Sequence, residues 1–146
     1  MTQATPLVGH VNEQDIPWVW AGDVGIQLLR VSTEGFVVRN RFKAGFQLPT
    51  HKHTGQVNAY TFSGTWCYAE QEVLYTAGTF VHEPASSTHT LTAVEDADVL
   101  FIVEGAFIEY DKEGTVSGVV DGASILEAYH LLCDMSGTPR PEGILQ

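Results

Sequence analysis

The sequence predicts an all-β domain with a single short helix near its C-terminus, and three observations support this. Between residues 25 and 120, short runs rich in β-branched and aromatic residues recur at close intervals. Glycine, proline, aspartate, asparagine or serine separates the runs, which is typical of a sandwich or barrel. Beyond residue 120 the apolar spacing becomes that of a helix. The length of 146 residues predicts one domain, residues 1–146, with a core of its own.

The predicted strands follow one another closely. They are residues 25–33, 35–42, 58–70, 78–84, 89–94, 98–111 and 114–120. Glycine supplies the positive φ of tight turns, so "FSGTW" (62–66) and "YDKEGTV" (110–116) are predicted to be hairpin connections. Residues 1–16 are expected to form an N-terminal arm that packs on the barrel or on a second subunit.

The helix is predicted over residues 122–136. Ser124 and Glu127 have the spacing of a capping box, and Gly137 is a stop signal. One face of this segment is apolar, since the following residues recur at helical spacing: Ile125, Leu126, Tyr129 and Leu132.

The charge of the chain excludes two classes of partner. Seven basic residues stand against 18 acidic ones, for a net charge of −11. Such a surface repels phosphate backbones and anionic lipids, so neither nucleic acid nor a membrane is an expected partner. No apolar run approaches membrane-spanning length, and the first residues lack a signal-peptide pattern. Cys67 and Cys133 form no zinc-type pair, and the simplest setting is a reducing cytoplasm, with a disulfide left open.

Two histidines open a strand-like run in the stretch "PTHKHTGQVNAYTFSGTW" (49–66). Side chains on a strand alternate between faces, so His51 and His53 point the same way. Two imidazoles on one face can clamp a metal ion. A buried hydrogen-bonded pair or a surface pair explains the same pattern, so the motif alone leaves these readings open.

Two blocks around these histidines resemble the two motifs of the cupin superfamily. The first block matches at Gly45, His51, His53 and Gly64. The second matches at Gly78, Pro84 and His89, with Ser86 and Ala93 where the motif has glycine and asparagine. The resemblance implies a double-stranded β-helix, a jelly-roll-like barrel, in which His51, His53 and His89 bind one metal ion.

One motif residue is missing, because the glutamate of the first motif falls at Val57 or Asn58. A three-histidine site without it resembles the small cupin dioxygenases that cleave carbon–carbon bonds in β-diketones and 2-hydroxyketones. Acetylacetone-cleaving and 2,4'-dihydroxyacetophenone dioxygenases are of this kind. The resemblance implies a non-haem Fe²⁺ enzyme that acts on a small ketone and dioxygen. Zn²⁺ or Ni²⁺ can replace iron in the isolated protein, because imidazole binds both at least as well.

Another carboxylate can take the place of the missing one. If the chain folds back as a hairpin on Ser63 and Gly64, Val57 pairs with Glu70, and directly opposed residues share a face. This register predicts Glu70 as a metal ligand or as a catalytic group beside the metal. A slip of one residue would turn Glu70 to the other face.

Four further residues are candidates for the substrate pocket: Trp66, Tyr68, Asn58 and Glu83. His82 and Glu83 are strand neighbours, so only one of them can face the interior. Core packing explains Trp66 and Tyr68 about as well as a pocket does.

Two other functions fit the same metal site. The first is a non-catalytic zinc-binding sensor cupin of the anti-sigma-factor type, although such proteins carry an additional N-terminal helical module. The second is a metal-dependent isomerase. A homodimer is expected, because barrels with open sheet edges often cover them with a partner.

Overall fold

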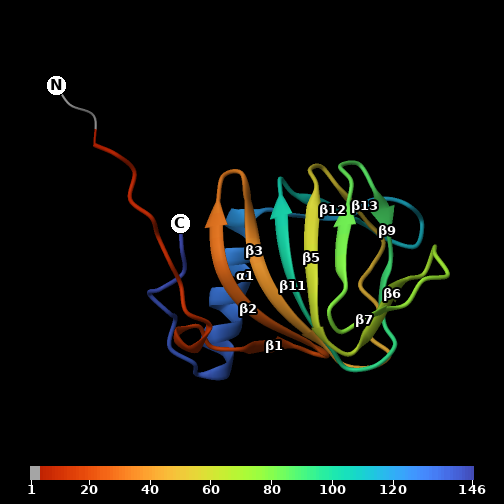
Figure 1. Ribbon diagram of the computed structural model, residues 1–146, viewed down its shortest axis with the longest axis horizontal. Helices are drawn as coiled ribbons and strands as arrows, with labels where there is room; N and C mark the ends of the chain where they lie inside the picture. Colours follow the sequence, from red (N-terminus) through yellow and green to blue (C-terminus); the bar gives the residue numbers. More distant parts are fainter. Residues whose placement is uncertain (1–3) are drawn as a thin grey trace.

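Three antiparallel sheets, one α-helix and a short 3-10 helix make up the structure, a computed structural model that describes residues 4–146 (Figure 1). The first three residues of the predicted arm lie outside the described residues. The largest sheet has the spatial order β1 (Val19–Ala21), β2 (Val24–Ser32), β3 (Gly35–Phe42), β11 (Ala97–Glu104), β5 (Val57–Ser63) and β8 (Phe80–Glu83). The second sheet has the order β13 (Val116–Val120), β12 (Phe107–Tyr110), β4 (His51–His53) and β9 (Thr88–His89). The third has the order β10 (Leu91–Ala93), β6 (Thr65–Tyr68) and β7 (Tyr75–Thr76). The all-β prediction is confirmed.

The core lies between the sheets, and strand alternation explains which side chains fill it. On β3, Phe36 and Val38 are buried, and on β11 their direct cross-strand partners Val103 and Phe101 are buried as well. Ile102 lies between those two partners on β11 and is 46% exposed. Each central strand therefore has an inner apolar face and an outer face.

One predicted hairpin is confirmed and the other is wrong. Residues 110–116 join β12 to β13, which pair with each other. Residues 62–66 join β5 to β6, but β5 pairs with β11 and β8, whereas β6 pairs with β10 and β7. At Gly64 (φ +84°) the chain passes from one sheet to another, and an added Cβ would lie 1.9 Å from the carbonyl oxygen of Asp96. The glycine is needed for this close crossing rather than for a hairpin.

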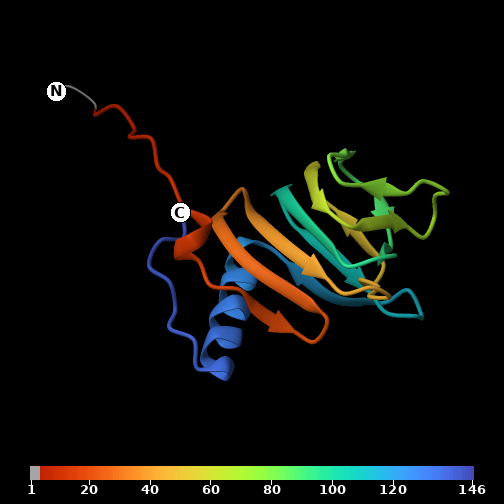
Figure 2. The same ribbon diagram turned by 60° about the horizontal axis from the view of Figure 1, so that its bottom comes forward.

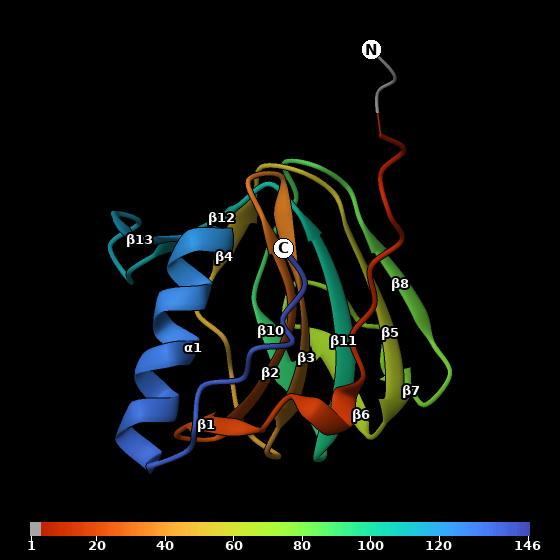
Figure 3. The same cartoon turned by 90° about the vertical axis from the view of Figure 1, so that its left-hand side faces the viewer.

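Helix α1 spans Gly122–Ser136, the range that the sequence predicts, but its cap differs. Asp121 is the N-cap and Ser124 completes the capping box as the third helical residue, so Ser124 is not the cap itself. Gly137 ends the helix in the left-handed conformation, as predicted. The helix contacts β1, β2 and β13 and so covers the side of the barrel between two sheets (Figure 3).

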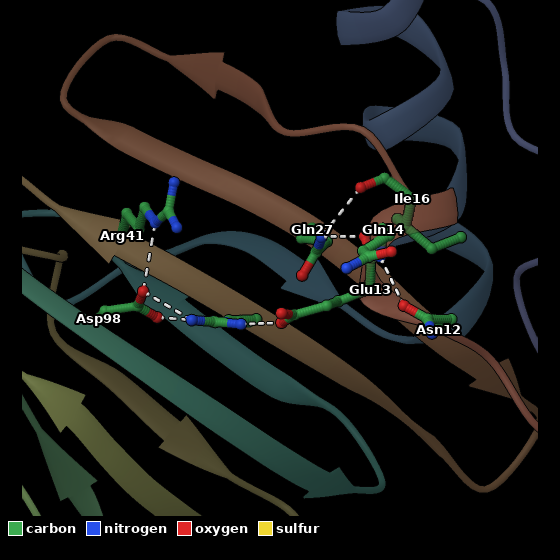
Figure 4. A network of polar contacts seen from close by, with 8 residues as sticks. Asn12, Glu13, Gln14, Ile16, Gln27, Arg41 and Asp98 are labelled. Carbon is green, nitrogen blue, oxygen red and sulfur yellow. Dashed lines mark hydrogen bonds and ion pairs between the residues drawn. The ribbon is translucent and has the colours of Figure 1, made fainter.

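The N-terminal segment has two parts. Residues 4–10 are exposed and extend away from the barrel (Figure 2). Next to them the 3-10 helix η1 (Glu13–Asp15) lies against β2, where Gln27 Nε2 donates to the carbonyl oxygens of Glu13 (2.8 Å) and Ile16 (2.9 Å) (Figure 4). The predicted arm therefore packs on the barrel only at its C-terminal end.

Two further findings concern the setting of the chain. Cys67 and Cys133 are separate free thiols. Within residues 4–146, no helix has both the length and the apolar character needed to cross a membrane.

Candidate metal centre

Three buried histidines meet on the inner face of the second sheet. His51 and His53 share one face of β4, and His51 is the direct cross-strand partner of His89 on β9. The ring centroids are 4.9 Å apart for His51 and His53, and 4.7 Å apart for His51 and His89. One nitrogen from each of the three rings lies within 4.8 Å of the others. The predicted cluster therefore forms, because alternation and one antiparallel pairing bring these rings together.

The protonation of these rings suits a metal ion. Burial lowers the pKa of His51 and lowers that of His53 to about 4, so both rings are neutral at pH 7. The Nδ1–H of His51 donates to the carbonyl oxygen of Pro49 at 2.9 Å, which directs Nε2 inward. His53 Nδ1 and His89 Nε2 are buried and find no hydrogen-bond partner among residues 4–146. Buried nitrogens of this kind are costly unless a ligand uses them, so the residues fit a divalent metal ion.

The carboxylate at the centre is that of Glu83. Glu83 is 4% exposed and is the direct cross-strand partner of Val57, one of the two positions where the missing motif glutamate would fall. Its Oε1 lies 2.8 Å from His89 Nε2, without the alignment of a hydrogen bond, and its Oε2 lies 3.5 Å from His53 Nε2. The Tyr68 hydroxyl donates to Oε1. The centre thus has a carboxylate, which comes from the strand beside Val57.

Glu83 is ionised in this setting. Burial raises the pKa of its carboxyl group, but the contact with His89, the hydrogen bond from Tyr68 and the proximity of His53 outweigh burial, so the pKa is below its usual value. Burial and the charge of Glu83 raise the pKa of Tyr68, which therefore stays protonated and serves as a donor. A buried carboxylate, a phenol and two imidazoles thus form one connected polar group.

The prediction that Glu70 faces the centre is wrong. It depended on pairing Val57 with Glu70 across a β5–β6 hairpin that does not form. Glu70 lies in the turn after β6, is exposed, and accepts a hydrogen bond from the Thr90 backbone N–H at 3.0 Å. It is outside the histidine cluster, so no ligand or catalytic role follows from its position.

The other pocket candidates separate into two groups. Tyr68 contacts the centre through Glu83, as described above. Trp66 is fully buried in the core, where its Nε1–H donates to Thr61 Oγ1 at 2.9 Å, and it does not line the cavity beside the histidines. Asn58 is also misplaced by the prediction: it lies on the outer face of β5, 2.9 Å from exposed His82. Alternation explains this, because its neighbour Val57 takes the inner face.

An apolar cavity of about 170 Å³ opens beside the centre. His51, His53 and Glu83 form its polar wall. Its remaining wall is apolar apart from Asn40, and includes Phe36, Phe101 and Phe107 from three strands and Ile125 from helix α1. Phe36, Phe107 and Ile125 could not be assigned to the cavity from the sequence, because a strand pattern shows which residues are buried but not which of them border an empty space.

The turn before His89 contains a strained residue that gives one testable prediction. Ser86, which stands at the glycine position of the second motif, has φ +69°, the only non-glycine residue with positive φ in the described chain. An L residue pays about 1 kcal/mol in this region, and glycine does not. Ser86→Gly is therefore expected to raise the free energy of unfolding by up to about 1 kcal/mol. Urea titration measures this; a loss of stability would show that the Ser86 side chain is needed.

The barrel and the three-histidine cluster together define a cupin. A model of the ChrR cupin-like domain family matches residues 8–108, more than half of the chain. The chain therefore belongs to the ChrR cupin-like family. Among curated proteins, none matches the sequence.

Solved structures agree with this assignment. An RmlC-like cupin from Ralstonia eutropha JMP134 is 27% identical, with a TM-score of 0.85 over 96% of this chain and 95% of that one. A second cupin-like protein from the same organism, of unknown function, is 26% identical, with a TM-score of 0.82 over 93% and 91% of the two chains. An acetylacetone dioxygenase from Acinetobacter johnsonii is 15% identical, with a TM-score of 0.76 over 90% and 96%. At that identity the last similarity shows a shared fold.

Proposed function

We propose that this protein is a metal-dependent dioxygenase that cleaves a carbon–carbon bond in a small β-diketone or 2-hydroxyketone. The observation that carries the proposal is a cluster of three buried imidazoles and one buried carboxylate beside an apolar cavity, in whose wall His51, His53 and Glu83 lie. A purely structural metal site is usually closed by four protein ligands, whereas a catalytic one faces a space for substrate. The similarity to an acetylacetone dioxygenase suggests which ketones to test first.

His51, His53 and His89 would hold the ion, for which Fe²⁺ is our proposal. When bound, Fe²⁺ would supply redox chemistry with dioxygen and the Lewis acidity that eases loss of a proton from the ketone. Imidazole ligands bring no negative charge, so they would leave the full charge of the ion to attract the ketone oxygens. Pro49 holds the ring of His51 in one orientation through its carbonyl oxygen.

Glu83 replaces Glu70 as the proposed catalytic residue. Tyr68 donates to Glu83 Oε1 and so fixes the carboxylate, while Oε2 has only the 3.5 Å contact with His53. We assign to Oε2 the acceptance of the acidic proton of the ketone, because a general base must be ionised and border the substrate space. The aromatic and aliphatic wall excludes water and accommodates the apolar part of the ketone.

The test is an oxygen-electrode assay on protein loaded with Fe²⁺ under anaerobic conditions. Acetylacetone, other β-diketones and aryl hydroxyketones are added one at a time, and oxygen consumption is compared with the appearance of two carboxylic or carbonyl products. Protein loaded with Zn²⁺ is the matched control and should consume none. If iron-loaded protein consumes no oxygen with any ketone of these classes, the proposal is wrong.

A second candidate is a zinc-binding sensor domain, and the match to the ChrR cupin-like family favours it. A sensor would bind Zn²⁺ tightly and show no turnover with any ketone. The oxygen assay separates the two functions. It also separates the proposed enzyme from a metal-dependent isomerase, which would change a substrate without consuming oxygen.

A further inference from the structure

One part of the cavity wall comes from a helix rather than from a sheet. Among the described residues that line the cavity, Ile125 is the single contribution of α1, whereas the others lie on strands or, like Leu48, between two strands. Cross-strand pairing holds the strand residues in place: Val38, for example, lies between Leu28 on β2 and Phe101 on β11. Ile125 has no such neighbours, so it closes the cavity at a place that no strand covers.

That place is the seam between β2 of the largest sheet and β12 of the second sheet. In the part of the chain that the structure describes, β2 pairs with β1 and β3, and β12 pairs with β4 and β13, so no ladder joins them. Helix α1 contacts β2 and β13 and so spans the seam (Figure 3). Wall residues on this side keep some exposure, among them Ile26, Phe107 and Ile125, whereas those from β5, β8 and β11 are buried. Ile125 therefore stands between the cavity and the solvent.

Helix α1 is anchored on both sides of Ile125. Before it, Gly122 packs so closely on β2 that an added Cβ would lie 2.4 Å from the carbonyl oxygen of Ser32. After it, the hydroxyl of buried Tyr129 donates to the carbonyl oxygen of Pro17 at 2.6 Å. A larger ligand cannot push the side chain of Ile125 aside by moving the helix without breaking these contacts, and packed interiors resist such overfilling.

The volume of the cavity limits what it can hold. At about 170 Å³ the cavity is close in size to an engineered apolar cavity of roughly 150 Å³ that binds benzene. One six-membered ring, or an alkyl group of similar bulk, fills such a space, and a second fused ring exceeds it. Away from the metal centre the described wall is uncharged, with Asn40 as its one polar side chain, so it suits a neutral group.

We propose that Ile125 determines the largest substrate that the site accepts, and that the apolar part of this substrate is a neutral group no larger than one six-membered ring. The inference rests on the proposed function for the ketone itself, whereas the size limit follows from the cavity. A single extra methylene changes the discrimination of an apolar pocket by about 10- to 200-fold, so a whole extra ring should be rejected at least as strongly. Shortening Ile125 extends the cavity into the seam and should admit that ring.

The first test measures binding without turnover, on the full chain loaded with Zn²⁺. The probes are acetophenone and 2-acetonaphthone, two neutral methyl ketones that differ by one fused ring, titrated while NMR chemical shifts are followed. The wild type should bind acetophenone at least 10-fold more tightly than 2-acetonaphthone. Ile125→Ala should bind 2-acetonaphthone at least 10-fold more tightly than the wild type does. Because the two probes share one head group, their difference reports on the apolar wall alone.

Leu126→Ala is the matched control for this experiment. Leu126 is an isomer of Ile125 in the same turn of α1 and is also partly buried, but it does not line the cavity. Its replacement should leave both affinities within about two-fold of the wild type. Ile125→Val removes one methylene and should give a smaller gain for the two-ring ketone, so it serves if the alanine variant does not fold. Thermal unfolding verifies that each variant is folded.

A second test measures activity with iron-loaded protein and the α-hydroxy derivatives of the same two ketones. The wild type should have a kcat/KM at least 10-fold higher for the one-ring substrate, and Ile125→Ala should reduce this ratio. If neither derivative is consumed but the binding results hold, the size limit stands and the proposed function is wrong. Three binding results would each overturn the size limit: a wild type that does not prefer acetophenone, no gain of affinity for 2-acetonaphthone when Ile125 is shortened, or an equal gain in Leu126→Ala.

Discussion

Changing Glu83 to glutamine is expected to lower kcat at least 100-fold while leaving the fold intact. The amide keeps the shape of the side chain and still accepts the hydrogen bond from Tyr68, but it cannot take a proton. General bases typically contribute 10² to 10⁴ in rate. The measurement is steady-state oxygen consumption with the best ketone found, together with metal content and thermal unfolding of the same sample.

Glu70→Gln is the matched control for this change. Glu70 lies just after β6, two residues beyond Tyr68, but its side chain is exposed and accepts a hydrogen bond from the Thr90 backbone N–H. Its substitution should leave kcat within about two-fold of the wild type. Equal losses of kcat in both variants would contradict the assignment of Glu83. A loss of kcat confined to Glu70→Gln would support a pairing of Val57 with Glu70, which the structure does not have. If the Glu83→Gln variant instead loses its metal, Glu83 is a metal ligand rather than a base. Removal of a ligand weakens metal binding more than removal of a residue that only contacts a ligand.

Replacing His53 by alanine is expected to weaken metal binding by at least 100-fold. His53 is one of three ligands, and two neutral imidazoles cannot hold a divalent ion in competition with water and buffer as three can. The measurement is metal per chain after dialysis against a weak chelator. Because metal binding stabilises the folded state, removal of the metal should lower the melting temperature of the wild type. The same treatment should change the melting temperature of the variant little, because the variant holds little metal.

His82→Ala provides the control for the histidine experiment. His82 is on β8 beside Glu83, but it faces outward and contacts Asn58. This variant should keep its full metal content. Wild-type metal content in alanine variants of His51, His53 and His89 alike would show that the cluster is not a metal site.

The class of fold and the histidine cluster could be predicted from the sequence, because both depend on short-range patterns. Alternation along a strand is a local property, so His51 and His53 necessarily share a face once they lie on a strand. The helix at residues 122–136 is likewise defined by local spacing and by the glycine that follows it. The match of the glycines and Pro84 to the second motif identified His89 as the third candidate ligand. The structure places His89 directly across from His51.

The identity of the carboxylate was decided only by the tertiary structure. Glu70 and Glu83 are both glutamates near the end of a predicted strand, and alternation alone allows either to face inward. What separates them is which strand pairs with β5, and that depends on long-range contacts rather than on neighbouring residues. The close passage of Gly64 past Asp96 sends β6 to another sheet, so β8 takes the place beside Val57 and brings Glu83 into the centre. The local pattern determined which way side chains point along each strand, whereas the long-range pairing of strands decided which of them meet.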